Sequence, residues 1–159
     1  MWKPGFAFTE AVPALLRGYH RAPCVFSHVH RGTPERPGIV FGLDRGGACS
    51  GVAYHVHHRH REDVLRYLRE REQTTMVYLE RLLPVRLATG ARVSALTYTV
   101  DRTHKQYARK LTLDALVRQV RGARGRSGPN EAYIVETVAK LKAMGVRDTL
   151  LERLADELD

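Results

Sequence analysis

The sequence predicts an α+β fold, with most strands in the first part of the chain and most helices in the last part. Residues 15–26, 39–43 and 51–56 are apolar or alternate apolar with polar residues, and turn-forming residues separate them. This pattern is typical of strands joined by turns. The last third of the chain instead carries apolar residues at helical spacing. Strands first and helices last indicate an α+β domain.

The length of 159 residues favours a single domain over 1–159, large enough to bury a core without disulfide or metal support. No apolar run reaches the roughly 20 residues that span a bilayer. The first residues also lack the pattern of a signal peptide. Cys24 and Cys49 match no metal or redox spacing and are predicted to be free thiols. These observations favour a cytoplasmic location.

The chain carries 26 basic and 17 acidic residues, with a net charge of +9. This balance is compatible with a nucleic-acid partner and also with a small anionic substrate drawn to a basic cleft. The basic residues are mainly arginine, whose planar fork suits carboxylates as well as phosphates. Net charge alone therefore leaves both classes of partner open.

Local signals define the individual elements. Residues 31–38 form a turn-rich connector. Residues 61–73 carry an apolar stripe and charged pairs at i, i+4, which predict an amphipathic helix. Residues 85–87 and 91–100 return to strand character, with a turn at 89–91.

Three helices are expected to close the chain. They are predicted at 112–123, 129–144 and 148–158. Gly145 is placed as the C-terminal stop of the second of these helices.

Histidines gather at His55, His57, His58 and His60. Alternate positions of a strand point to one face, and histidine is the commonest transition-metal ligand. The arginines beside these histidines would repel a cation, and no Cys, Asp or Glu completes a ligand set within the cluster. The competing interpretation is a solvated strand end that runs into a helix.

The segment 125–130 (GRSGPN) combines two glycines with a serine that can cap a helix and a proline suited to its first turn. A helix that starts this way can bind an anion through free N–H groups. The segment lacks the GK[ST] of a P-loop. An anion site and a plain helix cap are the two interpretations.

Glu72 is expected near the end of the helix over 61–73, where the helix dipole is unfavourable to a carboxylate. Glu70 adds like charge nearby. A carboxylate in this position suits general base and acid chemistry. The competing interpretation is a surface glutamate paired with the arginines around it.

Two other chemistries have little support. Ser127 and Cys49 have no assignable His/Asp set, which argues against a nucleophile-based enzyme. The arginines of 61–73 are matched by carboxylates, and no aromatic-basic interleaving is present, which argues against a nucleic-acid module.

Six segments carry a resemblance to a known family. They are WKPGF at 2–6, RGYHRAPCVFS at 17–27, HRGTPERPGIVFGLDRGGACSGVAY at 30–54, VLRYLREREQTTMVY at 64–78, VDRTHKQYA at 100–108 and GRSGPNEAYI at 125–134. In this order they resemble the ChaC-like γ-glutamylcyclotransferases, the bacterial members most. HRGTPERPG and GRSGPN are the most specific pieces.

The resemblance implies one domain with a small mixed β-barrel-like sheet and helices packed around it. It implies the cleavage of glutathione, a small-molecule substrate, to 5-oxoproline and cysteinylglycine. It implies no metal or organic cofactor and no nucleic-acid partner. The implied reaction is an intramolecular aminolysis with one glutamate as general base and acid.

The resemblance also assigns residues. Glu72, in the Arg-Glu pair at the end of the helix, takes the place of the family's catalytic glutamate. Tyr133 lies in the family's Ser-Gly-x-Asn-x-x-Tyr run, beside the active-site cleft. It either orients substrate or packs in the core.

This chain departs from the family pattern in two places. The family has a Tyr-Gly-Ser-Leu loop directly before Trp-x-Pro-Gly-Phe, and the loop's N–H groups hold the γ-glutamyl group. Here the chain starts at Met1, just before Trp2, so the loop is expected to be missing. The cause is either a start site assigned to an internal methionine or a true truncation, which would give an inactive homologue. Residues 73–76 replace an apolar residue and a glycine that the family often has.

Overall fold

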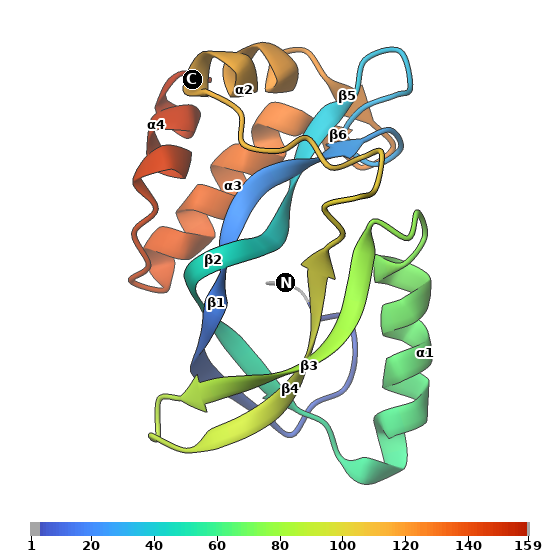
Figure 1. Cartoon of the computed structure of the whole chain (residues 1–159), viewed down its shortest axis with the longest axis vertical. Helices are drawn as coiled ribbons and strands as arrows, with labels where there is room; N and C mark the ends of the chain where they lie inside the picture. The colour runs from blue at the N-terminus through green and yellow to red at the C-terminus, as the bar shows by residue number, and fades with distance from the viewer. Residues whose placement is uncertain (1–3, 159) are drawn as a thin grey trace. The chain divides into compact units, whose positions relative to one another are not determined.

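The elements of the chain combine a sheet with several helices, which confirms the α+β prediction (Figure 1). The structure is a computed structural model that describes residues 4–158. Trp2 and Lys3, the start of the WKPGF match, lie outside the described residues. The strands are β1 (Glu10–Ser27), β2 (Gly38–His55), β3 (Tyr78–Leu87), β4 (Arg92–Val100), β5 (Arg124–Gly125) and β6 (Gly128–Pro129). The helices are η1 (His58–His60), α1 (Arg61–Glu72), α2 (Leu113–Val120), α3 (Asn130–Ala143) and α4 (Thr149–Asp156).

The four long strands close into a barrel in the order β1-β2-β4-β3, as the family resemblance implied. Strands β3 and β4 form an antiparallel hairpin whose register runs from Tyr78↔Val100 to Arg86↔Arg92. Strand β3 also pairs antiparallel with β1, and β2 pairs parallel with β4 through Leu43↔Thr99. Closure reduces the number of exposed sheet edges with which another chain can pair.

Strand β2 corrects one expectation. Two strands were expected, at 39–43 and 51–56, but the structure has one continuous strand over Gly38–His55, with the turn-forming residues 44–47 inside it. Gly46 and Gly47 have φ of +103° and +66°, conformations that glycine tolerates. The irregular backbone is therefore accommodated within the strand without reversing the chain.

Contacts within the chain divide it into two compact units. The barrel unit holds the described residues up to Ala22 together with Gly42–His104. The helical unit holds Pro23–Phe41 and the described residues from Lys105 onward. The expectation of one domain over 1–159 stays a prediction.

In the barrel unit, helix α1 packs through one stripe of its surface. Val64 and Leu68, one turn apart, are its buried side chains. Glu62 and Asp63 lie in its first turn, and Arg69 and Arg71 in its last turn, so both ends complement the helix dipole. The helix ends at Glu72, one residue before the predicted end.

In the helical unit, α2, α3 and α4 share one apolar core. Thr112 and Asp148 cap α2 and α4 by accepting from Ala115 N and Leu151 N. Gly145, with φ of +68°, follows the end of α3 as predicted. The fully buried core side chains are Ile39, Leu116, Val120, Ile134, Leu151 and Leu154.

No helix between residues 4 and 158 combines sufficient length with sufficient apolar character to cross a bilayer.

Candidate active site

Glu72 is the last residue of α1 and lies on the same stripe as Val64 and Leu68, at i, i+4, i+8 spacing. Its side chain is 21% exposed, which fits a position on the packed face of the helix. The carboxylate Oε1 lies 3.3 Å from Nε of Arg71. Among the described residues this is its one ion pair, so the interpretation as an arginine partner holds in part.

Arg71 itself is held by the rest of the barrel unit. Its Nη1 donates to the carbonyl of Pro4 at 3.1 Å and to the hydroxyl of Tyr67 at 3.3 Å. A Cβ at Gly5, where φ is +73°, would collide with the same tyrosine hydroxyl. The glycine therefore lets the segment around residues 4–6 approach the end of α1 closely.

A polar cluster lies beside the end of α1. Arg69 donates to both oxygens of Glu80, at 2.9 and 2.8 Å, and the hydroxyl of Tyr98 donates to Oε2 of Glu80 at 3.1 Å. These bonds join α1 to β3 and β4. Sequence reasoning missed this cluster, because its members lie 11 and 18 residues apart along the chain.

The electrostatics of the cluster follow from these contacts. The hydrogen bonds from Arg69 hold the pKa of Glu80 below its ordinary value, against the opposing effect of burial. The pKa of Tyr98 is raised, first by burial, then by the hydrogen bond and charge of Glu80, and least by the charge of Glu72. The last effect places the carboxylate of Glu72 within electrostatic reach of the Tyr98 hydroxyl.

Tyr133, on α3, belongs to the helical unit, whereas Glu72 belongs to the barrel unit. The Tyr133 hydroxyl accepts from the backbone N–H of Phe41 at 3.3 Å, and the two rings are 5.1 Å apart. The guanidinium carbon of Arg31 lies 5.1 Å from the centre of the tyrosine ring. These contacts show the packing role. A substrate-binding role for Tyr133 stays a prediction.

The GRSGPN segment forms the β5–β6 hairpin and the start of α3. Its N–H groups already have partners, since Arg126 N, Ser127 N and Asn130 N donate to carbonyls at 2.8 to 2.9 Å. Ser127 does not cap α3, and its hydroxyl is instead 2.9 Å from Nδ1 of His30. These three N–H groups are therefore not available to an anion.

Close backbone packing explains the glycines of this region. A Cβ at Gly125 would lie 2.5 Å from the carbonyl oxygen of Val29. A Cβ at Gly38 would overlap the carbonyl of Arg31 and lie 2.7 Å from Oδ1 of Asn130. The fully buried amide of Asn130 in turn bonds both the N–H and the carbonyl of Ile39, at 2.6 and 2.8 Å. The segment therefore acts structurally within the helical unit.

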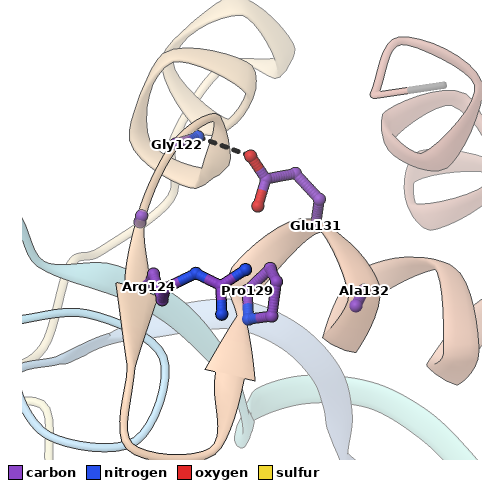
Figure 2. Close-up of a pocket in the computed structure, with 6 residues that line it drawn as sticks. Gly122, Arg124, Pro129, Glu131 and Ala132 are labelled. Atoms are coloured by element: carbon purple, nitrogen blue, oxygen red, sulfur yellow. Dashed lines mark hydrogen bonds between the residues drawn. The ribbon is translucent and has the colours of Figure 1, made fainter.

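An open hollow of about 420 Å³ lies at the start of α3 (Figure 2). Its wall includes the carboxylate of Glu131, which accepts from Gly122 N, and the side chain of Arg124. The two side chains carry opposite charges, and the carboxylate is already bonded. The hollow therefore offers no concentrated charge to a ligand.

The histidine cluster differs from the predicted strand. β2 ends at His55, and residues 58–60 form a 3₁₀ helix whose N-cap, His57, accepts from Arg59 N. The rings of His57 and His58 stack with their centres 4.2 Å apart. Within residues 4–158 no three His, Cys, Asp or Glu side chains are grouped so as to hold a metal ion.

Both cysteines are free thiols, as predicted. Cys24 is buried in the helical unit, whereas Cys49 is half-buried and its sulfur lies 3.5 Å from Nη2 of Arg21.

Comparison with known proteins identifies the class. A solved yeast γ-glutamyl cyclotransferase specific to glutathione has the same fold. It matches with a TM-score of 0.88 and 21% identity, over 99% of this chain and 90% of the yeast chain. The chain is 32% identical to the glutathione-specific γ-glutamylcyclotransferase of Escherichia coli (strain K12), over 97% of this chain and 67% of that protein. It is 29% identical to γ-glutamylcyclotransferase 2-3 of Arabidopsis thaliana, over 99% and 83% of the two chains.

The match to a protein family extends over the whole sequence. The model of the ChaC-like protein family matches residues 1–159. The chain therefore belongs to the ChaC-like family, as the six resembling segments indicated.

Proposed function

We propose that this protein is a γ-glutamylcyclotransferase that cleaves glutathione to 5-oxoproline and cysteinylglycine. The observation that carries the proposal is the family match over 1–159, together with a carboxylate at Glu72 on the packed face of α1. The named relatives from Escherichia coli and Arabidopsis thaliana support the same reaction class.

Glu72 is the proposed general base and acid. Its carboxylate takes a proton from the α-ammonium group of the γ-glutamyl residue, and the freed amine attacks the γ-carbonyl carbon. The new C–N bond closes the five-membered ring, and the old amide C–N bond breaks. Glu72 returns this proton to the departing nitrogen, and the second proton lost by the ring nitrogen leaves cysteinylglycine with an ammonium group, so no co-reactant is consumed. Ring closure needs only correct placement of groups within one molecule, which favours catalysis by positioning.

The ion pair of Glu72 and the anchoring of its partner support this role. The ion pair with Arg71 engages Oε1, and Arg71 is itself held by Pro4 and Tyr67. Among the described residues Oε2 has no ion-pair partner, which leaves one oxygen for the substrate ammonium. The proposed role for Tyr133 is to orient the substrate, as its place in the family's Ser-Gly-x-Asn-x-x-Tyr run implies.

The test is to incubate the purified protein with glutathione and measure 5-oxoproline by mass spectrometry. Glu72→Gln is expected to lower kcat by about 10²- to 10⁴-fold, the usual contribution of general acid–base catalysis. Glu70→Gln is the matched control, because Glu70 lies on the exposed side of the same helix. A Glu72→Gln variant with unchanged kcat would refute the catalytic assignment. A wild-type protein that forms no 5-oxoproline would refute the activity.

We also propose that the protein works in the cytoplasm, where the free thiols Cys24 and Cys49 stay reduced. Fractionation of source cells followed by immunodetection tests the location. Recovery with the membrane or secreted fraction would contradict it.

A further inference from the structure

All four strands of the barrel contribute to a second, smaller pocket in the barrel unit. Its volume is about 150 Å³. The residues that matter for its chemistry are Tyr19 on β1, Arg45 on β2, Arg81 on β3, Thr99 on β4, and Arg102 and Thr103 just after β4. Three guanidinium groups and three hydroxyl groups therefore belong to the residues around one small space.

The charges around this pocket are unequally compensated. Arg102 is paired, because its Nε lies 2.6 Å from Oδ1 of Asp44, whose side chain is only 10% exposed. Arg81 donates through Nε to the hydroxyl of Thr99, a neutral group, at 3.2 Å. Between residues 4 and 158 no carboxylate lies within 4.0 Å of the guanidinium of Arg81 or Arg45.

The one carboxylate in the pocket wall is already engaged. Asp101 accepts from the backbone N–H of Thr103 at 2.9 Å and from its hydroxyl at 2.7 Å. These bonds, and to a small extent the charge of Arg81, hold the pKa of Asp101 below its ordinary value. With Arg102 offset by Asp44 and one further charge offset by Asp101, the wall keeps an excess of one positive charge.

We infer that the pocket binds the carboxylate group of a small organic acid, with the guanidinium of Arg81 as its main partner. An arginine fork matches the two oxygens of a carboxylate and bonds them more strongly than neutral donors do. A cavity of about 150 Å³ holds a molecule of roughly the size of benzene, which is too little for a whole tripeptide. It is enough for a carboxylate with a short carbon chain or a small ring.

The identity of the molecule that supplies the carboxylate is inferred from the proposed function. Glutathione carries one carboxylate at its glycyl end and one on its γ-glutamyl residue, and 5-oxoproline carries one. The same chemistry therefore belongs to substrate and to product. The larger hollow near α3 is less suited, because Glu131 and Arg124 compensate each other there.

Binding measurements test the pocket independently of any enzymatic activity. L-5-oxoproline and acetate are titrated separately into the protein and followed by NMR chemical shifts. For Arg81→Gln we expect the Kd to rise about 10- to 100-fold, as for loss of one charge-assisted hydrogen bond. Arg86→Gln is the matched control, since it removes the same charge from the same strand at an exposed position on the opposite face.

Thermal unfolding of each variant verifies that it folds, and Arg81→Lys provides a second variant that keeps the charge but loses the fork. Equal binding by wild type and Arg81→Gln would overturn the inference, as would the absence of binding of either acid to wild type. Tighter, Arg81-dependent binding of inorganic phosphate would overturn the assignment to carboxylates.

Kinetics then identify the source. An analogue of glutathione with a C-terminal amide is compared with glutathione itself. If the glycyl carboxylate occupies the pocket, the amide lowers kcat/KM about 10- to 100-fold in wild type but not in Arg81→Gln. If the product occupies it, the amide has no such effect, and inhibition by 5-oxoproline is lost in Arg81→Gln. Arg81-dependent binding in a protein without turnover would leave this inference intact and refute the proposed function alone.

Discussion

The side chain of Glu72 is constrained at both of its ends. The stripe shared with Val64 and Leu68 sets the direction in which it leaves the helix, and Arg71 contacts its carboxylate. A flexible surface glutamate has neither constraint. Catalysis by a single carboxylate depends on such positioning, because a small misplacement of the base costs far more than a small change in its acidity.

At the same scale, Glu80 provides a pH-dependent contribution to stability. Its folded pKa lies below its unfolded value of about 4.3, because Arg69 hydrogen-bonds the charged form. This stabilisation is complete above the unfolded pKa and is lost as pH falls through the lower folded pKa.

Glu80→Gln is therefore expected to lower the free energy of unfolding by about 1 kcal/mol at pH 7, at most, since solvent screens the half-exposed Arg69. The difference from wild type should shrink as the pH is lowered below about 4. Urea unfolding at several pH values measures it. The exposed pair Asp63–Arg66 supplies the control, through Asp63→Asn, which should change stability less. A difference that grows toward acid pH would contradict the sign.

At the scale of the element, the buried amide of Asn130 joins the start of α3 to β2 through Ile39. Both atoms that it bonds are backbone groups next to a fully buried side chain. This one residue therefore fixes the approach of a helix to a strand within the helical unit.

Asn130→Ala should leave the N–H and the carbonyl of Ile39 without their side-chain partner and cost about 3 kcal/mol of unfolding free energy. Chemical denaturation measures the loss. Glu136→Ala, at an exposed position of α3, should change stability by less than about 0.5 kcal/mol. If both variants are equally stable, the Asn130 bridge contributes nothing to the fold.

The starts of the helices were predictable because their signals are local. The helices predicted from residues 112 and 148 begin one residue later, with Thr112 and Asp148 as N-caps, and Gly145 follows α3 as expected. The predicted end at residue 123 was wrong, because α2 ends at Val120. The length of β2 was not predictable, because partners elsewhere in the barrel decide whether a glycine-rich stretch turns or continues. Turn composition permits a reversal but does not require one.

The residues of the candidate site were likewise predictable only in part. Glu72 was predicted through its resemblance to a family motif, whereas its own surroundings suggested an ordinary ion-pair partner. Tyr98, Glu80 and Arg81 were missed entirely, because their significance arises from neighbours across strands β3 and β4. The sequence of one strand shows that charged and hydroxyl side chains alternate along it, but it does not show which side chains of other strands they contact.

At the scale of the whole molecule, the net charge of +9 means that folding brings many like charges together. Each of the five ion pairs between described side chains is neutral overall, so the pairs leave this positive excess unchanged. Salt screens the remaining repulsion over a Debye length of about 8 Å at physiological ionic strength.

Sodium chloride is therefore expected to raise the melting temperature, by about 2–4 °C between low and physiological salt, which corresponds to about 1 kcal/mol. Scanning calorimetry measures the shift, with an uncharged solute at equal osmolality as control. A melting temperature that falls with salt would show that the surface ion pairs outweigh the repulsion.

The crowding of backbone around Gly38 and Gly125 has a consequence for surveys of genomes. HRGTPERPG and GRSGPN are the two segments most specific to the family. Their conformations are set by close backbone packing and by the hydrogen bonds of the Asn130 amide. A descendant that had lost its chemistry would still need them in order to fold. A search pattern built on these segments therefore counts relatives that share the fold, and it does not test the proposed catalytic position at the end of α1.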